Sequence, residues 1–130
     1  MSEFTSQVTF MYFDDMEKAT RFFEEILKLE KVYNPEWAAV YRVAEKAYIG
    51  AVDASRGSIE SKIRGGTLVS LTVDDVMSSY ELLKDEELLT NVSEIREFED
   101  IGVRSFFFKG PNGYDFEIQQ FTVSDIEKLF

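Results

Sequence analysis

The sequence predicts an α+β fold, a single domain built from two βαβββ modules in tandem at about 7–53 and 66–121. The first observation is an internal repeat, in which Val-Thr-Phe-Met-Tyr-Phe-Asp-Asp-Met from position 8 aligns without a gap on Leu-Val-Ser-Leu-Thr-Val-Asp-Asp-Val from position 68. Each copy reads as a strand, an Asp-Asp helix cap, a helix and then three strands. The second observation lies near the C-terminus, where an aromatic run, Gly-Pro-Asn-Gly and an alternating segment predict a closing hairpin over 103–121.

The first module begins with a β-favouring run at 8–13. Asp14 or Asp15 can then cap the free amides at the start of a helix. Apolar residues recur after this cap at helical spacing, at Met16, Ala19, Phe22, Phe23, Ile26 and Leu27. Such a stripe must lie against a sheet. Three further strands are predicted, at 30–34, 37–43 and 47–52.

The second module repeats this order after a polar stretch at 53–66, which is predicted to be a linker or loop. A strand at 68–73 leads into Asp74 and Asp75, and a helix follows in which Val76, Tyr80 and Leu83 point inward. The remaining elements are predicted as a short strand at about 92–98, the closing hairpin, and a last helical turn at 124–127.

The closing hairpin has two chemically different faces. Pro111 pre-sets its turn, and Gly113 can take a positive φ there. Alternation along the last strand then places Tyr114, Phe116 and Ile118 on one face, and Asp115, Glu117 and Gln119 on the other. We expect the first face to pack the core and the second to carry the carboxylates.

Composition excludes several classes of function. The 130 residues include 25 acidic and 14 basic side chains, a formal net charge of -11 that repels a phosphate backbone, so we expect no nucleic-acid partner. The acidic surface either maintains solubility or favours a cationic ligand. The chain has no cysteine, which excludes disulfides and thiolate metal sites, and no histidine, the commonest metal ligand and general base.

The N-terminal segment, Met-Ser-Glu-Phe-Thr-Ser-Gln, lacks the basic start and apolar core of a signal peptide. No apolar run approaches the roughly 20 residues that a membrane span needs. We therefore expect a cytoplasmic protein that makes no membrane contact.

The repeat, the order of elements and the closing hairpin together resemble the vicinal oxygen chelate superfamily, over roughly 7–121. This superfamily includes glyoxalase I, bleomycin resistance proteins, fosfomycin resistance enzymes and extradiol dioxygenases. The resemblance implies curled mixed sheets around a cup, and a homodimer, because the family usually pairs its subunits. In its metal enzymes, ligands stand on the first and last strands of both modules.

Carried onto this sequence, those ligand positions fall on Val8, Leu68, Gly50 and Glu117. Only Glu117 has a metal-binding side chain, whereas catalytic zinc sites keep three protein ligands. The resemblance therefore implies no metal and no other cofactor here. A three-oxygen site stays open as an alternative, although Asp115 and Gln119 lie about 7 Å from Glu117 along the strand.

If Val8 and Leu68 face the cup, alternation puts further side chains on its wall. We expect a ligand to contact Phe10, Tyr12, Trp37, Tyr48, Ser70, Thr72 and Glu117. A carboxylate among aromatic rings suits a cationic or planar nitrogenous ligand. The structural alternatives are an ion pair of Glu117 with Arg104 or Arg42, a packing role for Phe10 and Tyr12, and a dimer contact for Trp37.

Three functions remain open. The first is a metal-independent binding protein of the glyoxalase and bleomycin resistance type, which holds an aromatic molecule, charged or uncharged, in the cup. The second is an enzyme, either lyase-like or dioxygenase-like with an altered metal site at Glu117, or an isomerase using Glu117 and Tyr12. The third is an interaction or regulatory module. Ser70 and Thr72 have no histidine to activate them, so we expect no triad-type nucleophile.

Overall fold

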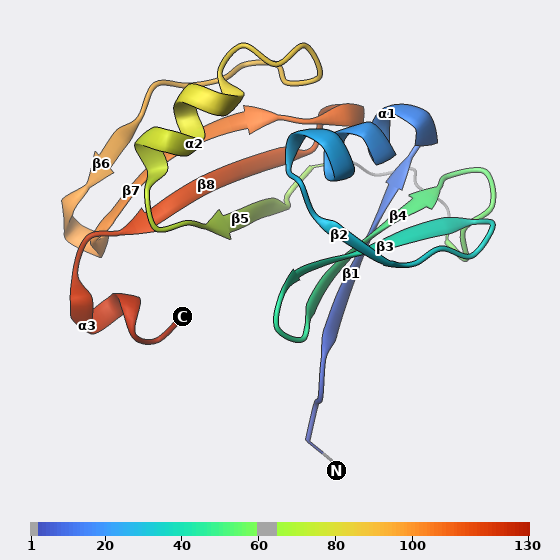
Figure 1. Cartoon of the computed structure of the whole chain (residues 1–130), viewed down its shortest axis with the longest axis horizontal. Coiled ribbons are helices and arrows are strands. Elements are labelled where there is room, and N and C mark those ends of the chain that lie inside the picture. Colours follow the sequence, from blue (N-terminus) through green and yellow to red (C-terminus); the bar gives the residue numbers. More distant parts are fainter. Residues whose placement is uncertain (1–2, 60–64) are drawn as a thin grey trace. The chain divides into compact units, whose positions relative to one another are not determined.

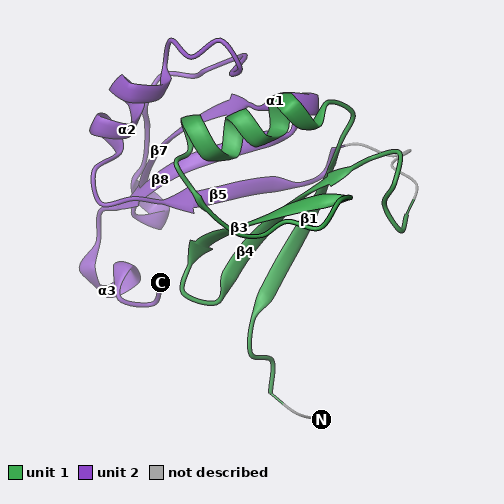
Figure 2. Ribbon diagram, turned by 45° about the vertical axis from the view of Figure 1, so that its right-hand side comes forward, with its two compact units in different colours: residues 1–64 green, residues 65–130 purple. Residues whose placement is uncertain are grey.

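The chain forms two compact units, Met1–Arg64 and Gly65–Phe130, which are coloured separately in Figure 2. A computed structural model describes residues 3–59 and 65–130. The boundary between the units falls in the stretch predicted as a linker, of which 60–64 lie outside the described residues.

The first unit is a four-stranded sheet with one helix on it (Figure 1). Its elements are β1 (Gln7–Phe13), α1 (Met16–Arg21), the π-helical turn η1 (Phe22–Ile26), β2 (Glu30–Tyr33), β3 (Ala38–Ala44) and β4 (Ala47–Asp53). The strand order is β1-β4-β3-β2, in which β1 runs parallel to β4 and the other pairs are antiparallel. This is the predicted βαβββ order.

The helix of the first unit starts at a side-chain cap and ends in a wider turn. The Asp15 carboxylate accepts a hydrogen bond of 3.1 Å from the backbone amide of Lys18, so Asp15 is the cap. The predicted helix continues as the π-helical turn η1, which is closed by a bond from the Leu27 amide to the Phe22 carbonyl. Phe23 of this turn is buried, and it stacks on Tyr41 of β3 with ring centroids 5.2 Å apart.

The second unit repeats the arrangement. Its elements are β5 (Leu68–Thr72), α2 (Val76–Leu83), β6 (Arg96–Phe98), the 3-10 turn η2 (Glu99–Ile101), β7 (Val103–Lys109), the 3-10 turn η3 (Pro111–Gly113), β8 (Asp115–Phe121) and α3 (Ser124–Glu127). The strand order is β5-β8-β7-β6, and β5 runs parallel to β8. The α+β fold with two tandem βαβββ modules is thus confirmed.

Helix α2 covers one face of the second sheet (Figure 1). Asp75 caps it by accepting a bond from the Ser78 amide, as Asp15 does in the first unit. Tyr80 of α2 packs edge-on against Phe106 of β7, with centroids 5.2 Å apart, and Val76 and Leu83 are buried as predicted. The Asp-Asp repeat therefore marks the same local structure twice.

Two details differ from the sequence-based expectation. The turn between β7 and β8 uses positive φ at Asn112 as well as at Gly113, with values of 64° and 75°. Asparagine tolerates this region better than other non-glycine residues do, so a single glycine suffices. The short strand predicted at about 92–98 is restricted to Arg96–Phe98.

Helix α3 ends the second unit, and Phe130 beyond it stacks on Phe121 of β8 with centroids 4.8 Å apart. Among the described residues, no helix has the length and apolar character needed to cross a membrane.

Candidate functional site

The side of the second sheet that faces away from α2 carries polar side chains from neighbouring strands. The pairing of β5 with β8 and of β8 with β7 brings Ser70, Glu117 and Phe107 to one level, with their side chains on the same face. Phe106, one residue along, points the other way and packs against α2. We call the side that carries Glu117 the polar face. Its members on β5, β7 and β8 are Leu68, Ser70, Thr72, Val103, Ser105, Phe107, Lys109, Asp115, Glu117, Gln119 and Phe121, and the pairing of β6 with β7 adds Arg96 and Phe98.

Glu117 lies at the centre of the polar face. Glu117 is only 9% exposed, and its Oε1 accepts a short hydrogen bond from the Ser70 hydroxyl. One rung further along the same two strands, the Gln119 amide donates to the Thr72 hydroxyl at 3.1 Å. These two contacts tie β5 to β8 by side chains as well as by backbone.

Glu117 does not form the ion pair that the sequence allowed. Arg104 pairs with Glu97 at 2.6 Å, and Arg42 pairs with Glu30 at 3.3 Å. Arg104 sits directly across from Gln120 and Glu97, so alternation puts it on the side of the sheet opposite Glu117. No ion pair between described residues involves Glu117.

An aromatic ring lies beside this carboxylate. Phe107 of β7 lies directly across from Glu117 of β8. The guanidinium carbon of Arg96 lies 5.8 Å from the centre of the Phe107 ring. Phe98 meets the same ring edge-on at 6.3 Å. Phe107 therefore already serves as a surface for a cation, which is the chemistry that an organic cation would use.

Ser105 adds a buried hydroxyl to the polar face. It lies across from Gln119, is fully buried, and its Oγ has no hydrogen-bond partner among the described residues. Alternation in the 103–109 run places Ser105 on the side of Phe107, so this signal was present in the sequence although the residue was not picked out.

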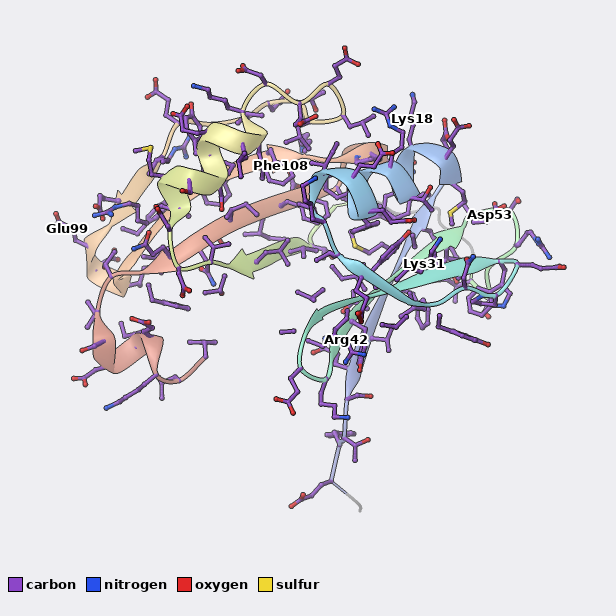
Figure 3. All side chains as sticks on the ribbon, in the orientation of Figure 1. Lys18, Lys31, Arg42, Asp53, Glu99 and Phe108 are labelled. Atoms are coloured by element: carbon purple, nitrogen blue, oxygen red, sulfur yellow. The ribbon has the colours of Figure 1, made fainter. Side chains whose placement is uncertain are left out.

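The face of the first sheet that is equivalent to the polar face carries aromatic side chains. Phe10 of β1 is 46% exposed, and its ring centroid lies 6.0 Å from that of Trp37, which is 38% exposed. Tyr48 of β4 accepts a 3.3 Å bond from Arg42, whose guanidinium also lies over the Tyr48 ring at 5.5 Å. Figure 3 labels Arg42 on this sheet.

Tyr12 shares the side of Phe10 but lies under a loop of its own unit. The backbone amide of Ile59 donates to the Tyr12 hydroxyl at 3.2 Å, and Tyr12 is 8% exposed. A Cβ atom built on Gly57 would come 2.2 Å from the Tyr12 ring, so this glycine lies flat against it. Tyr12 thus packs against the loop after β4.

The pairing of the strands locates the four positions at which the resemblance leads us to expect metal ligands. Phe10 pairs with Gly50 in the first sheet where Ser70 pairs with Glu117 in the second, which supports Gly50 as the counterpart of Glu117. The sequence aligns Val8 with Leu68. Val8, Leu68 and Gly50 offer no side-chain ligand atom, and the described residues contain no group of three carboxylates suited to a metal ion. This donor set does not fit the metal site that the resemblance describes.

An open pocket of about 420 Å³ lies at one end of the second sheet. Its lining comes from the start of β5, the loop at Asn91, the end of β7 and the start of β8. Leu68, Phe107, Lys109 and Asp115 reach it from the polar face, and the Lys109 ammonium contacts the Asp115 carboxylate at 2.7 Å.

Comparison with solved structures identifies the fold. Lactoylglutathione lyase from Agrobacterium tumefaciens matches with a TM-score of 0.68 and 20% identity, over 89% of this chain and 92% of that one. A fosfomycin resistance protein from Listeria monocytogenes matches with a TM-score of 0.71 and 16% identity, over 97% and 98%. The chain has the vicinal oxygen chelate fold.

An antibiotic-binding protein from a Streptomyces species shares this vicinal oxygen chelate fold, with a TM-score of 0.73, 18% identity, and coverage of 93% of this chain and 98% of that one. No protein-family model matches the sequence. No curated protein matches it either. The similarity is one of structure, and it confirms the resemblance at the level of the fold.

Proposed function

We propose that this protein binds a small aromatic, cationic molecule, with Glu117 as the charged anchor and without a metal ion. The observation that carries the proposal is the state of Glu117, a nearly buried carboxylate that is held by a serine hydroxyl and lacks a cationic partner among the described residues. Buried charges are normally paired, because transfer from water is otherwise unfavourable. A ligand cation would supply the missing partner.

The neighbouring ring defines the second requirement. Phe107 lies across from Glu117, so a planar cationic group that takes the place of the Arg96 guanidinium on this ring can contact both the ring and the carboxylate. The partly exposed pair of Phe10 and Trp37 gives the first unit an aromatic surface of its own. In the second unit, we propose that Ser70 and Thr72 contribute to ligand binding beside Glu117. In the first unit, Phe10, Trp37 and Tyr48 stay proposed contacts for an aromatic ligand.

Similar folds support a binding role. One structural neighbour is an antibiotic-binding protein, and another is a fosfomycin resistance protein. The chemistry of the four expected ligand positions, of which Glu117 alone carries a donor atom, favours binding over the metal-dependent enzyme at Glu117.

The proposal is tested by isothermal titration with two ligands that differ in charge, tryptamine and indole-3-ethanol. A carboxylate anchor predicts that Glu117→Gln weakens tryptamine binding by roughly tenfold or more, because charge-assisted hydrogen bonds contribute about 1.5 to 3 kcal/mol. Indole-3-ethanol should bind both proteins alike. Glu97→Gln is the matched control, since Glu97 is exposed and paired with Arg104 on the same sheet. Equal tryptamine affinity for all three proteins would contradict the proposal.

The homodimer and the cytoplasmic location stay predictions. Light scattering of the purified chain measures the first, and fractionation of the source cells measures the second.

A further inference from the structure

We infer that the ligand is zwitterionic, an aromatic molecule that carries a carboxylate beside its ammonium group. The inference rests on the proposed function and extends it to the neighbouring pocket of about 420 Å³. A pocket of this size suits a small organic molecule. Leu68, Phe107, Lys109 and Asp115 bring the polar face into its wall, and Phe108 and Phe116 of the opposite face line it as well. Asp115 lies two residues before Glu117 on β8, and Phe107 lies across from Glu117.

The pocket offers one charge of each sign, side by side. Lys109 and Asp115 face each other across β7 and β8, and their Nζ and Oδ1 atoms are 2.7 Å apart. A lysine ammonium has three N–H donors, and this ion pair uses one of them. A carboxylate likewise has a second oxygen to offer. A zwitterion can therefore place its carboxylate on Lys109 and direct its ammonium toward Glu117, two residues along β8 on the same face, while the internal pair stays intact.

The net charge of the protein selects against a purely anionic molecule. The chain carries a net charge of -11, which repels an anionic molecule over the distance that salt leaves unscreened. A purely cationic molecule would make no use of the two N–H donors of Lys109 that the pair with Asp115 leaves over, and Lys109 would repel it at short range. A zwitterion has no net negative charge for the protein to repel, and its carboxylate can accept from Lys109.

The apolar part of the pocket fits the rest of such a molecule. Phe107 presents a ring and Leu68, which is 49% exposed, presents an aliphatic surface. These two side chains lie on the same face as the ion pair, on β7 and β5. An aromatic group can lie against them while the carboxylate of the ligand reaches Lys109 and its ammonium points toward Glu117.

Three probes with one indole ring test this inference: tryptophan, tryptamine and indole-3-propionate. We expect tryptophan to bind the wild-type protein about tenfold more tightly than either single-charge analogue, since each of them lacks one charge-assisted bond. Lys109→Met should reduce tryptophan affinity to the level of tryptamine. Lys128→Met is the matched control, because Lys128 forms a comparable pair with Asp125 on α3.

The outcomes separate this inference from the proposed function. Equal binding of tryptophan and tryptamine, with both lost in Glu117→Gln, would overturn the zwitterion and leave the proposed function standing. A preference for tryptophan that survives Lys109→Met would also overturn the inference, and circular dichroism checks that this variant is folded. Tryptophan binding that depends on Lys109 but not on Glu117 would support the pocket and contradict the anchor. Absence of binding by all three probes at millimolar concentration would overturn both.

Discussion

The ring of Phe10 lies directly over Gly50, at the place in the first sheet that the Ser70–Glu117 contact occupies in the second. A Cβ atom on Gly50 would come 2.4 Å from Phe10 Cδ1. The two units thus share a strand order and register but present different chemistry at equivalent positions, an aromatic ring in one and a carboxylate in the other. This difference is the basis for assigning the charged anchor to the second unit.

The first prediction concerns the contact between Gly50 and Phe10. Gly50→Glu should destabilise the protein by about 1 to 3 kcal/mol, because the new side chain has to displace the Phe10 ring. Adding Phe10→Ser recreates the arrangement of the second sheet, so the double variant should be more stable than the sum of the two single effects indicates. Chemical denaturation of the four proteins measures the coupling free energy. Strict additivity would show that the two positions are not equivalent to Ser70 and Glu117.

Ser70→Ala should lower the free energy of unfolding by about 1 to 3 kcal/mol. The substitution removes the hydroxyl donor from a carboxylate that is nearly buried, and such a group loses more than an exposed one when its partner is deleted. Thr72→Val is the control one rung along, where the Thr72–Gln119 bond is exposed and its loss should have a smaller effect. A larger loss for Thr72→Val would contradict the central place given to Glu117.

Gly57→Ala should destabilise the loop that covers Tyr12. The added methyl group would approach Tyr12 Cε2 to 2.2 Å, and relief requires the loop or the ring to move, at about 1 to 3 kcal/mol. Tyr12→Phe separates the two contacts, since it keeps the ring and removes the 3.2 Å bond from Ile59. We expect a smaller loss of about 1 kcal/mol in urea denaturation for this variant. Unchanged stability of Gly57→Ala would mean that the loop does not rest on Tyr12.

We predict that the protein loses stability at alkaline pH because of the ionisation of Tyr41. Its pKa is raised well above the ordinary value of 10.0, first by burial and then by its 2.8 Å hydrogen bond to Glu24 and the charge of that carboxylate. Because the folded-state pKa exceeds the unfolded-state value, the folded protein binds this proton more strongly. The contribution to stability is therefore complete below about pH 10 and is lost as the pH rises above it.

The comparison of wild type with Tyr41→Phe isolates this contribution, because the other titrating groups are common to both proteins. In urea denaturation from about pH 9 to about pH 11, wild-type stability should fall more steeply than that of the variant. Parallel curves would show that the Tyr41 pKa is the same in the folded and unfolded states.

Most of the fold could be predicted because its signals are local. The repeated Asp-Asp caps, the helical stripe from Met16 and the Gly-Pro-Asn-Gly turn each act within a few residues, and the structure forms an element at each. The π-helical turn η1 has no such local signal. It appears where Phe22 and Phe23 are both buried, and that burial depends on the sheet.

The candidate site was less predictable because its contacts join distant parts of the chain. Ser70 and Glu117 are 47 positions apart, and so are Tyr12 and Ile59. The predicted ion pair of Glu117 with Arg104 was wrong, and strand alternation explains why. Odd-numbered residues of β7 share the side of Glu117, whereas even-numbered ones such as Arg104 point to the other side. Ser105 was missed although the same rule finds it.

Whether Glu117 anchors an organic cation or binds a metal ion decides the function of this protein. The direct measurement is isothermal titration of chelator-treated protein, first with Zn²⁺, Mn²⁺, Ni²⁺ and Mg²⁺ and then with tryptamine, for wild type and Glu117→Gln. We predict no saturable metal binding, and one-to-one tryptamine binding that Glu117→Gln weakens about tenfold or more. Tight one-to-one binding of a metal ion that disappears in Glu117→Gln would contradict the cation anchor and make a metal-dependent enzyme the better explanation.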